Sequence, residues 1–598
     1  MYVIATAGHV DHGKSTLVRA LTGMEPDRWA EEKRRGLTID LGFAWTVLPS
    51  GRDVAFVDVP GHERFLGNML AGLGPAPAVC FVVAADEGWQ AQSGDHRDAL
   101  AALGLEHGVI VVTKADRAPD RVDAVLAQTR AELAGTGLAQ APAVTVSAMT
   151  GEGLDGLRAE LDRVLTGLPG PDAAGRVRFW VDRSFTVKGA GAVATGTLTA
   201  GALTEGDRLE VLGEGVRRSV TVRALHSRNE SHQSIGPTRR VAVNLRGTSS
   251  ESVHRGDTLV TPGAWPLAEM VDIRRTTGAE LTEAPAQLLV HVGTATVPAH
   301  VRPFSERHAR LTLGRPLPLV PGDRLVLRDP GSHSVFGGAH VLDVDPPALN
   351  RRGDGTRHAA YLETVPSGGS PLLEVRRRGA VREAFLRTLG LLPWDNGAAT
   401  GADEVRVLAG WWVHAPVLAR WAADLRAAVA AWGDRDPLAA GLSRGAAAES
   451  IGADPELLDA VIAEAGLVQD GGFVALPGEG RGLGPAEPAV AAVEARLAAN
   501  ALDAPERDEL TALGLGPKAL AAAERKGRIL RLDGDVVLLP TAPARAMREL
   551  ARLGQPFTVS QARQAWGTTR RVAVPLLEHL DARGWTRRLD GALREVAR

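Results

Sequence analysis

The stretch Gly8-His9-Val10-Asp11-His12-Gly13-Lys14-Ser15 decides the fold of the first domain. It follows an apolar, strand-like run, Val3–Ala7, and precedes a helix-like stretch that begins at Thr16. The spacing G-x-x-x-x-G-K-S is that of a phosphate-binding loop, whose backbone N–H groups wrap the phosphates of a nucleotide. Lys14 is placed to reach the β- and γ-phosphates, and the Ser15 hydroxyl to bind Mg²⁺. The stretch therefore predicts a nucleotide site made by Gly8, His9, Val10, Asp11, His12, Gly13, Lys14, Ser15 and Thr16.

Three further segments narrow the base to guanine. In Asp58-Val59-Pro60-Gly61 the carboxylate can hold Mg²⁺ through water, and the Gly61 amide can sense the γ-phosphate. In Thr113-Lys114-Ala115-Asp116 the Asp116 carboxylate can accept from N1–H and the exocyclic amine of guanine, a donor pair that adenine lacks. Lys114 would lie along the purine ring, and Ser147-Ala148 would contact the guanine O6 edge. An apolar strand with a loop explains any one of these segments but not four in order, so we expect GTP or GDP with Mg²⁺.

Length and composition indicate several domains. The 598 residues are 44% hydrophobic and 23% charged, which is typical of a soluble protein with about four domains. No run approaches the roughly 18 apolar residues of a membrane helix, and the start lacks a signal-peptide pattern, so we expect a cytoplasmic protein without membrane contact. The single cysteine, Cys80, lies in an apolar run, which favours a buried thiol and excludes an internal disulfide.

The sequence pattern changes along the chain. Up to about residue 170, apolar strands alternate with amphipathic stretches, which predicts an α/β domain with a parallel sheet. Short strands with Gly-Asp turns predict two β-barrels over about 176–345. Flexible joints are predicted at 366–371 and 478–485.

The C-terminal part contains a recurring unit. A helix is followed by a hairpin signal at Asp470-Gly471, Asp533-Gly534 and Asp590-Gly591, at intervals of 63 and 57 residues. A helix capped by a β-hairpin is typical of a winged helix. An earlier copy has its expected wing at 407–413. The sequence therefore predicts a C-terminal array of winged-helix domains.

With its four motifs in order, the first domain resembles the translational GTPases. The segment 35–40, Arg-Gly-Leu-Thr-Ile-Asp, resembles their first switch, in which Thr38 would bind Mg²⁺ while the γ-phosphate is present. His62 matches the histidine that positions the attacking water when the ribosome is engaged. The resemblance implies catalytic roles for His62 and Lys14. It implies the metal-binding set Ser15, Thr38 and Asp58.

Other residues extend or qualify this resemblance. Val10 and Leu37 match the apolar pair that keeps His62 from the water, and Asp11 matches a residue associated with a monovalent cation. Thr113 departs from the family pattern Asn-Lys-x-Asp, in which the Asn amide braces the phosphate loop. We therefore expect a weaker brace and weaker nucleotide retention, with guanine selection through Asp116 intact.

The whole layout resembles the bacterial selenocysteine-specific elongation factors. Elongation factor Tu ends after two barrels, whereas this chain has about 230 further residues. The resemblance is strongest in 4–72 and 182–197, and it implies a monomer that binds selenocysteyl-tRNA, an mRNA hairpin beside a UGA codon, and the ribosome. The expected domains are a GTPase domain (1–172), two barrels (173–265, with the aminoacyl pocket, and 266–347), a linker with a first winged helix (348–430), and winged helices at 431–482, 483–542 and 543–598.

The resemblance also suggests how selenocysteine is selected. A selenol is more acidic than a serine hydroxyl, so at neutral pH selenocysteine carries a negative charge that a cationic pocket attracts. Arg183 and Arg240 match family positions proposed for that pocket, with His226 as a neighbour.

Charge is concentrated at the C-terminal end. The chain has a net charge of −3, which argues against a generally basic surface, but residues 541–598 hold eleven arginines and five acidic residues. We predict RNA contacts at this end because guanidinium groups suit phosphates and splayed bases. The predicted contact residues are Arg570, Arg571, Arg587 and Arg588; a solvated arginine surface is the alternative.

Two other functions are open at this point. A general aminoacyl-tRNA carrier explains the GTPase domain and the barrels but not the winged helices. A winged-helix regulator of DNA with an attached GTPase domain explains the C-terminal array but not the barrels.

Overall fold

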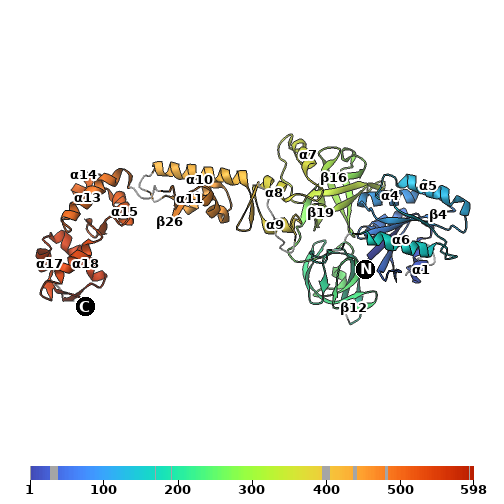
Figure 1. Cartoon of the computed structure of the whole chain (residues 1–598), viewed down its shortest axis with the longest axis horizontal. Helices are drawn as coiled ribbons and strands as arrows, with labels where there is room; N and C mark the ends of the chain where they lie inside the picture. Colours follow the sequence, from blue (N-terminus) through green and yellow to red (C-terminus); the bar gives the residue numbers. More distant parts are fainter. Residues whose placement is uncertain are drawn as a thin grey trace. The chain divides into compact units, whose positions relative to one another are not determined.

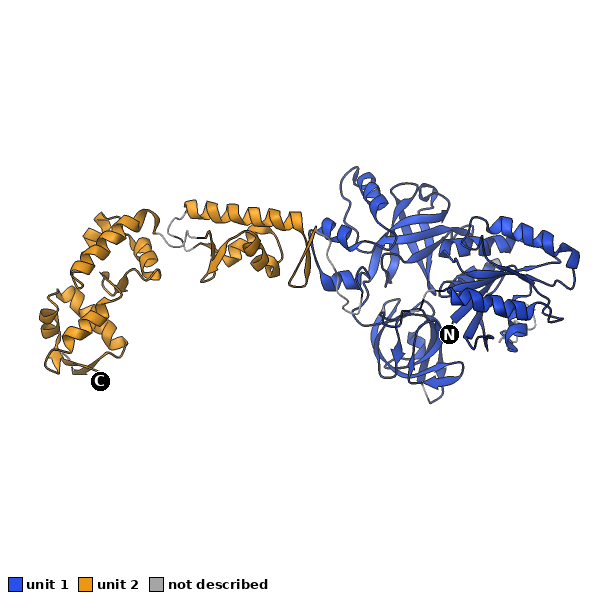
Figure 2. Ribbon diagram, viewed as in Figure 1, with its two compact units in different colours: residues 1–402 blue, residues 403–598 orange. Residues whose placement is uncertain are grey.

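The computed structural model describes residues 2–26, 38–168, 170, 172–189, 191–393, 404–435, 439, 441–477, 483–590 and 593–597. The chain divides into two compact units, residues 1–402 and 403–598 (Figure 2). The first unit contains an α/β domain and two closed barrels, and the second contains helices with short hairpins. The predicted multidomain architecture is confirmed.

The α/β domain is a six-stranded sheet with helices on both faces (Figure 1). Its strands are β1 (Tyr2–Ala7), β2 (Gly42–Val47), β3 (Asp53–Asp58), β4 (Ala78–Ala84), β5 (Gly108–Thr113) and β6 (Ala143–Thr145). Its helices are α1 (Lys14–Thr22), α3 (Leu66–Leu73), α4 (Ala91–Leu103), α5 (Val122–Leu133) and α6 (Leu154–Thr166). The strand order is β2-β3-β1-β4-β5-β6, parallel except for β2, an antiparallel edge strand that the sequence analysis did not predict.

The apolar residues of this domain form a core on each face of the sheet. Residues of α1 and α6 pack on one face, and residues of α3, α4 and α5 on the other. Because both faces are covered, the central strands are buried throughout, which explains their continuous apolar runs. Cys80 in β4 is buried as predicted, and burial raises the pKa of its thiol to about 12.

The first barrel follows the α/β domain. Its strands are β7 (Arg178–Val187), β8 (Gly191–Leu198), β9 (Leu203–Thr204), β10 (Arg208–Gly213), β11 (Val216–Ser227), β12 (Glu230–His232), β13 (Ser234–Ile235), β14 (Arg239–Arg246) and β15 (Thr258–Val260). The order β10-β15-β7-β8-β14-β11 closes through the pairing of β10 with β11. The inward residues of these strands form one apolar core.

The second barrel packs against the α/β domain. It closes in the order β16-β19-β18-β17-β20-β21, and α4 lies on its β20 and β21. Gly338 of β21 shows how close the contact is, since an added Cβ would lie 2.6 Å from Ala102 Cα. The strands are β16 (Ala268–Gly278), β17 (Gln287–Val292), β18 (Ala295–Pro303), β19 (His308–Leu317), β20 (Arg324–Arg328) and β21 (Val335–Asp343).

The segment after the second barrel corrects one prediction. The stretch 366–371, expected to be a flexible joint, is a turn between two helices. The Ser370 hydroxyl caps the second helix by accepting from Leu373 N, and a Cβ on Gly369 would lie 2.5 Å from Leu391 Cδ2. Composition suggests a joint here, but packing against neighbouring segments fixes the turn. The elements are α7 (Asp354–Thr364), α8 (Pro371–Arg378), β22 (Ala380–Arg382) and α9 (Glu383–Thr388).

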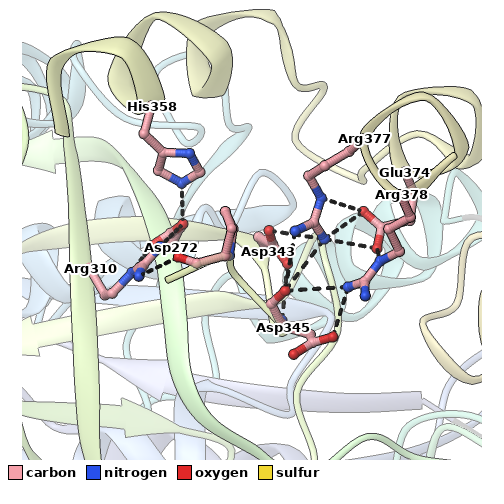
Figure 3. A network of polar contacts seen from close by, with 9 residues as sticks. Asp272, Arg310, Asp343, Asp345, His358, Glu374, Arg377 and Arg378 are labelled. Atoms are coloured by element: carbon pink, nitrogen blue, oxygen red, sulfur yellow. Dashed lines mark hydrogen bonds and ion pairs between the residues drawn. The ribbon is translucent and has the colours of Figure 1, made fainter. Parts of the chain in front are cut away.

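Ion pairs hold α7 and α8 to the second barrel (Figure 3). Asp272 of β16 is fully buried; it accepts from Arg310 at 2.7 and 3.0 Å and contacts His358 of α7. Arg378 of α8 pairs with Asp345 at 2.7 Å. Removing Asp272 alone would leave a buried guanidinium without its charge partner, which typically costs about 3–5 kcal/mol.

The second unit begins with two hairpins and three helices. The expected wing at 407–413 is the hairpin of β23 and β24, which turns at Ala409 and Gly410 with positive φ. The predicted hairpin at Asp470-Gly471 is confirmed as β26 and β27. The elements are β23 (Val405–Leu408), β24 (Trp411–His414), α10 (Ala415–Arg435), β25 (Leu442–Ser443), α11 (Arg444–Ile451), α12 (Leu458–Glu464), β26 (Val468–Asp470) and β27 (Phe473–Ala475).

The last part of this unit has one continuous core. Buried residues from Leu483 to Leu580 form a single apolar cluster, so the segments predicted as the third and fourth winged helices pack together. One hairpin turns at Asp533-Gly534, and the strands of another lie on either side of 591–592. Residues 591–592 are outside the described residues, and so are residues 478–482 of the predicted second joint. The elements are α13 (Glu487–Ala499), α14 (Arg507–Ala512), α15 (Pro517–Arg525), β28 (Leu530–Leu532), β29 (Val536–Leu538), α16 (Ala542–Leu550), β30 (Phe557–Thr558), α17 (Val559–Ala565), α18 (Arg570–Ala582), β31 (Thr586–Asp590) and β32 (Leu593–Val596).

Candidate functional site

The loop between β1 and α1 has the geometry of a phosphate cradle. Gly13 caps α1 with φ 81°, and a Cβ on Gly8 would lie 2.1 Å from Val82 O. Lys14 is buried, and its Nζ donates to Gly8 O at 2.9 Å and His9 O at 2.7 Å. A Cβ on Gly61 would lie 2.6 Å from Lys14 Nζ, so the turn after β3 meets the loop at its lysine. The first two predicted motifs therefore meet.

The three residues predicted to bind Mg²⁺ also meet here. Ser15 Oγ lies 3.0 Å from Thr38 Oγ1. Asp58 is fully buried; its Oδ1 accepts from Thr6 at 2.7 Å, and its Oδ2 has no hydrogen-bond partner among the described residues. Burial raises the pKa of Asp58, and Ser15 and Lys14 oppose that shift. Two hydroxyls beside a buried carboxylate oxygen form the oxygen donor set that Mg²⁺ prefers.

Three histidines lie at the phosphate loop: His9 and His12 belong to it, and His96 comes from α4. The sequence analysis did not predict His96. His96 of α4 is buried, and its Nδ1 accepts from Gly8 N at 3.0 Å. Burial holds the pKa of His96 well below its usual range and lowers the pKa of His12 to about 4. These rings are therefore neutral near pH 7. His96 stands on an amphipathic helix without a motif, so no sequence signal identified it.

The guanine side of the site shows how Thr113 contacts the phosphate loop, and weaker nucleotide retention stays a prediction. Thr113 Oγ1 donates to His12 O at 2.7 Å and is buried, so a hydroxyl braces the phosphate loop where the family pattern has an amide. The Ala115 amide donates to Val146 O at 3.3 Å, which brings the loop of Lys114 and Asp116 beside that of Ser147 and Ala148. Asp116 is exposed.

Lys114 has partners that sequence reasoning missed. Its Nζ lies 2.8 Å from Glu87 Oε1 and 3.4 Å from Asp86 Oδ1, and its backbone has φ 53°. These acids follow β4, so two carboxylates from the neighbouring strand end hold the Lys114 ammonium.

His62 begins the segment after the turn at Gly61. Its side chain is half-buried, and its Nδ1 accepts from Arg64 N at 3.2 Å. The other ring nitrogen, Nε2, is therefore the one left to contact a ligand or water. Val10, the first residue of the predicted apolar pair, is half-buried in the phosphate loop; Leu37, the second, lies outside the described residues.

The three residues of the predicted aminoacyl pocket line one cavity of about 180 Å³. Arg183, Arg240 and His226 come from the first barrel, and Phe43 and Trp45 of β2 complete the wall. Arg240 is stacked 3.3 Å above the Phe43 ring and donates to Asp182 at 2.9 Å. Arg183 donates to Asp40 at 2.8 Å. The sequence analysis did not predict Asp182 or Asp40 as partners of these arginines, because the ion pairs form only in the folded chain.

The terminal arginines divide into two groups. Arg570, Arg587 and Arg588 are exposed, and Arg587 pairs with Glu595. Arg571 instead donates to Ala504 O at 2.8 Å and Pro505 O at 3.1 Å, and its Nε lies 3.2 Å from Glu506. The RNA contact of Arg571 stays a prediction, and because its guanidinium is bonded to the preceding winged-helix segment we expect Arg571 to contribute less than Arg570.

Family models match four segments in chain order. "Elongation factor Tu GTP binding domain" matches 1–167 and "Elongation factor Tu domain 2" matches 191–260. "Selenocysteine-specific elongation factor, beta-barrel domain" matches 269–348, and "Elongation factor SelB, winged helix" matches 548–592.

Full sequences and solved structures agree with these matches. A selenocysteine-specific elongation factor of Escherichia coli is 38% identical over 70% of this chain and 68% of its own. That of Desulfomicrobium baculatum is 33% identical over 65% and 63%. Elongation factor Tu 2 of Streptomyces avermitilis is 30% identical over only 57% of this chain but 96% of its own. A crystal structure of a bacterial selenocysteine-specific elongation factor has the same fold, with a TM-score of 0.75 at 24% identity over 100% of both chains.

Proposed function

This chain belongs to the selenocysteine-specific elongation factors, a family of translational GTPases, and on that premise we propose that it delivers selenocysteyl-tRNA to the ribosome at UGA codons. The observation that carries the proposal is the cavity in which Arg183, Arg240 and His226 meet β2 of the GTPase domain. No helix among the described residues is both long and apolar enough to cross a membrane. The general carrier is less well supported, because elongation factor Tu matches little more than half of the chain.

The nucleotide site supports GTP hydrolysis by positioning and charge stabilisation, without a covalent intermediate. Lys14 is held at the loop by two carbonyls and is placed to stabilise phosphate charge. Mg²⁺ held by Ser15, Thr38 and, through water, Asp58 would add positive charge at the same phosphates. His62 orders the attacking water when the ribosome is engaged, because the Arg64 amide occupies Nδ1 and leaves Nε2 as the ring nitrogen that can contact that water.

Charge explains the choice of amino acid. The cavity wall holds three guanidinium groups, those of Arg183, Arg228 and Arg240, and a selenolate gains from them what a neutral serine hydroxyl does not. Asp182 and Asp40 reduce this positive charge. Arg255 lies 3.5 Å from Asp40 as well, so two arginines share that one carboxylate and neutralise it more than a single pair would.

The terminal winged helix is proposed to hold the mRNA hairpin. Arg570 at the start of α18 and Arg588 on β31 are exposed cations on its surface. A winged-helix regulator that binds DNA would use the same groups, so filter binding of 485–598 should compare an RNA hairpin with duplex DNA. Tight, salt-resistant binding to the duplex would favour the regulator.

The proposal is tested by comparing the binding of three tRNA preparations. We expect the GTP-bound full chain to bind selenocysteyl-tRNA more tightly than seryl-tRNA or bulk aminoacyl-tRNA, and an Arg183→Ala, Arg240→Ala double variant to lose most of that preference. The matched control is Arg178→Ala, which removes an arginine of the same strand that pairs with Asp323 away from the cavity. Equal affinities of the unaltered chain for the three tRNA preparations would contradict the proposal.

A further inference from the structure

Asp40 joins the nucleotide site to the aminoacyl cavity through one short segment. Thr38 Oγ1 lies 3.0 Å from Ser15 Oγ of the phosphate loop. Two residues later, Asp40 Oδ2 accepts from Arg183 Nη2 at 2.8 Å, and Arg183 lines the cavity. An extended chain rises about 3.3 Å per residue, so these two contacts are separated by only a few ångströms of backbone.

The segment is held between its two ends as well. Ile39 O accepts from Asn68 Nδ2 at 2.9 Å, and Asn68 Oδ1 accepts from Arg255 at 2.9 Å. Arg255 also lies 3.5 Å from Asp40 Oδ1. Asn68 stands on α3, just after the turn that carries Gly61 and His62. The segment 38–40 is therefore tied to the first barrel and to both parts of the nucleotide site.

Two of the cavity arginines, Arg240 and Arg183, differ in where their carboxylates come from. Arg240 pairs with Asp182, a neighbour on the same barrel whose side chain is 7% exposed. Arg183 pairs with Asp40, which is 29% exposed and belongs to the GTPase domain. The first pair is fixed within one barrel. The second depends on the position of the segment that contains Thr38.

We propose that Asp40 is a positioning residue that couples GTP binding to selection of selenocysteine. With Thr38 docked beside Ser15, Asp40 aims the Arg183 guanidinium along the cavity wall; when the segment leaves the loop, Arg183 loses that partner. This inference rests on the proposed function of the cavity. Because coupling between two binding equilibria is reciprocal, bound selenocysteyl-tRNA must raise GTP affinity by the same factor.

The test compares selenocysteyl-tRNA affinity with a GTP analogue and with GDP in the full chain. For Asp40→Asn we expect the ratio of the two dissociation constants to fall about tenfold, mainly through weaker binding in the analogue complex. Affinity for the GTP analogue alone should fall by a smaller factor, because the ion pair of Asp40 with Arg183 helps to hold Thr38 beside Ser15. Asp40→Glu, which keeps the charge, should restore most of the ratio, and binding of seryl-tRNA should not respond.

A second interdomain ion pair provides the matched control. Asp53 of β3 pairs with Arg228 of the first barrel, which also lines the cavity, but Asp53 is not on the segment 38–40. Asp53→Asn should leave the nucleotide dependence intact.

The possible failures are distinguishable. An Asp40→Asn variant that behaves like Asp53→Asn, or that loses seryl-tRNA binding equally, overturns the inference and leaves the proposed function standing. An unaltered chain without preference for selenocysteyl-tRNA overturns the proposed function, and the inference with it.

Discussion

The phosphate loop and the terminal winged helix present their cations in opposite ways. Lys14 is buried and bonded to two carbonyls of its own loop, whereas Arg570, Arg587 and Arg588 are exposed. Lys14 is positioned by residues within six places of it in the chain. Arg571, adjacent to Arg570, is taken up by carbonyls 66 and 67 residues away. The phosphate-loop motif thus fixes the contacts of Lys14 by itself, whereas the contacts of each terminal arginine depend on distant parts of the chain.

The largest expected effect concerns the local site. His62→Ala should reduce ribosome-stimulated GTP hydrolysis by about 100-fold or more, because a misplaced nucleophile typically costs that much. GTP affinity should stay the same, since His62 does not line the phosphate loop. Single-turnover hydrolysis with saturating ribosomes measures the loss. A variant of unaltered rate would show that the segment after Gly61 does not act as the motif predicts.

Acid should affect the first unit more than the second. Burial lowers the pKa values of His12, His291 and His308 to about 4, below the ordinary value of 6.5. The unfolded chain therefore binds more protons between these values, so stability present above pH 6.5 is lost as the pH falls toward 4. The second unit has only two of the chain's sixteen histidines. Hydrogen exchange at pH 7, 5.5 and 4.5 should show protection falling first in residues 1–402; equal losses in both units would argue against this cause.

Arg570 and Arg571 are adjacent in sequence, and variants of the two test whether an exposed and a bonded arginine differ in RNA binding. Arg570→Ala should weaken binding of the mRNA hairpin and reduce the slope of log affinity against log salt by about 0.7–0.9, as expected for one lost phosphate contact. Arg571→Ala should leave that slope unchanged but lower stability by about 1–3 kcal/mol, because Ala504 and Pro505 lose their donor. Salt titrations and urea unfolding of the two variants measure this difference. If both variants change the slope equally, Arg571 reaches RNA after all.

The smallest expected effect is at the brace of the phosphate loop. Thr113→Val keeps the shape but removes the hydroxyl that donates to His12 O, so GTP affinity should fall by roughly fivefold, the equivalent of about 1 kcal/mol. Thr113→Ser, which keeps the hydroxyl, is the control. Equilibrium titration with a fluorescent GTP analogue measures both. An unchanged affinity of Thr113→Val would mean that the brace does not support the loop.

Particular residues show how far the sequence could lead. Gly13, Lys14, Asp58 and Asp116 were recognised because each motif carries its own backbone geometry at a strand end. The alternation of strand and helix likewise predicted the parallel sheet. The edge strand β2 was missed because it comes directly after the segment 35–40, which the sequence analysis treated only as a switch. The prediction of a flexible joint at 366–371 was wrong, because glycine and proline indicate a turn but not whether other residues pack against it.

The sequence by itself determined the nucleotide site, the order of the domains and the hairpins of the winged helices, since these depend on contacts between residues close in the chain or at strand ends. Only the tertiary structure decided which carboxylate meets which guanidinium. Asp40 with Arg183, Asp182 with Arg240, and Arg571 with the carbonyls of Ala504 and Pro505 are contacts across many residues or between domains. A charged side chain is the same in sequence whether it faces water, a ligand or a partner, and folding alone places that partner.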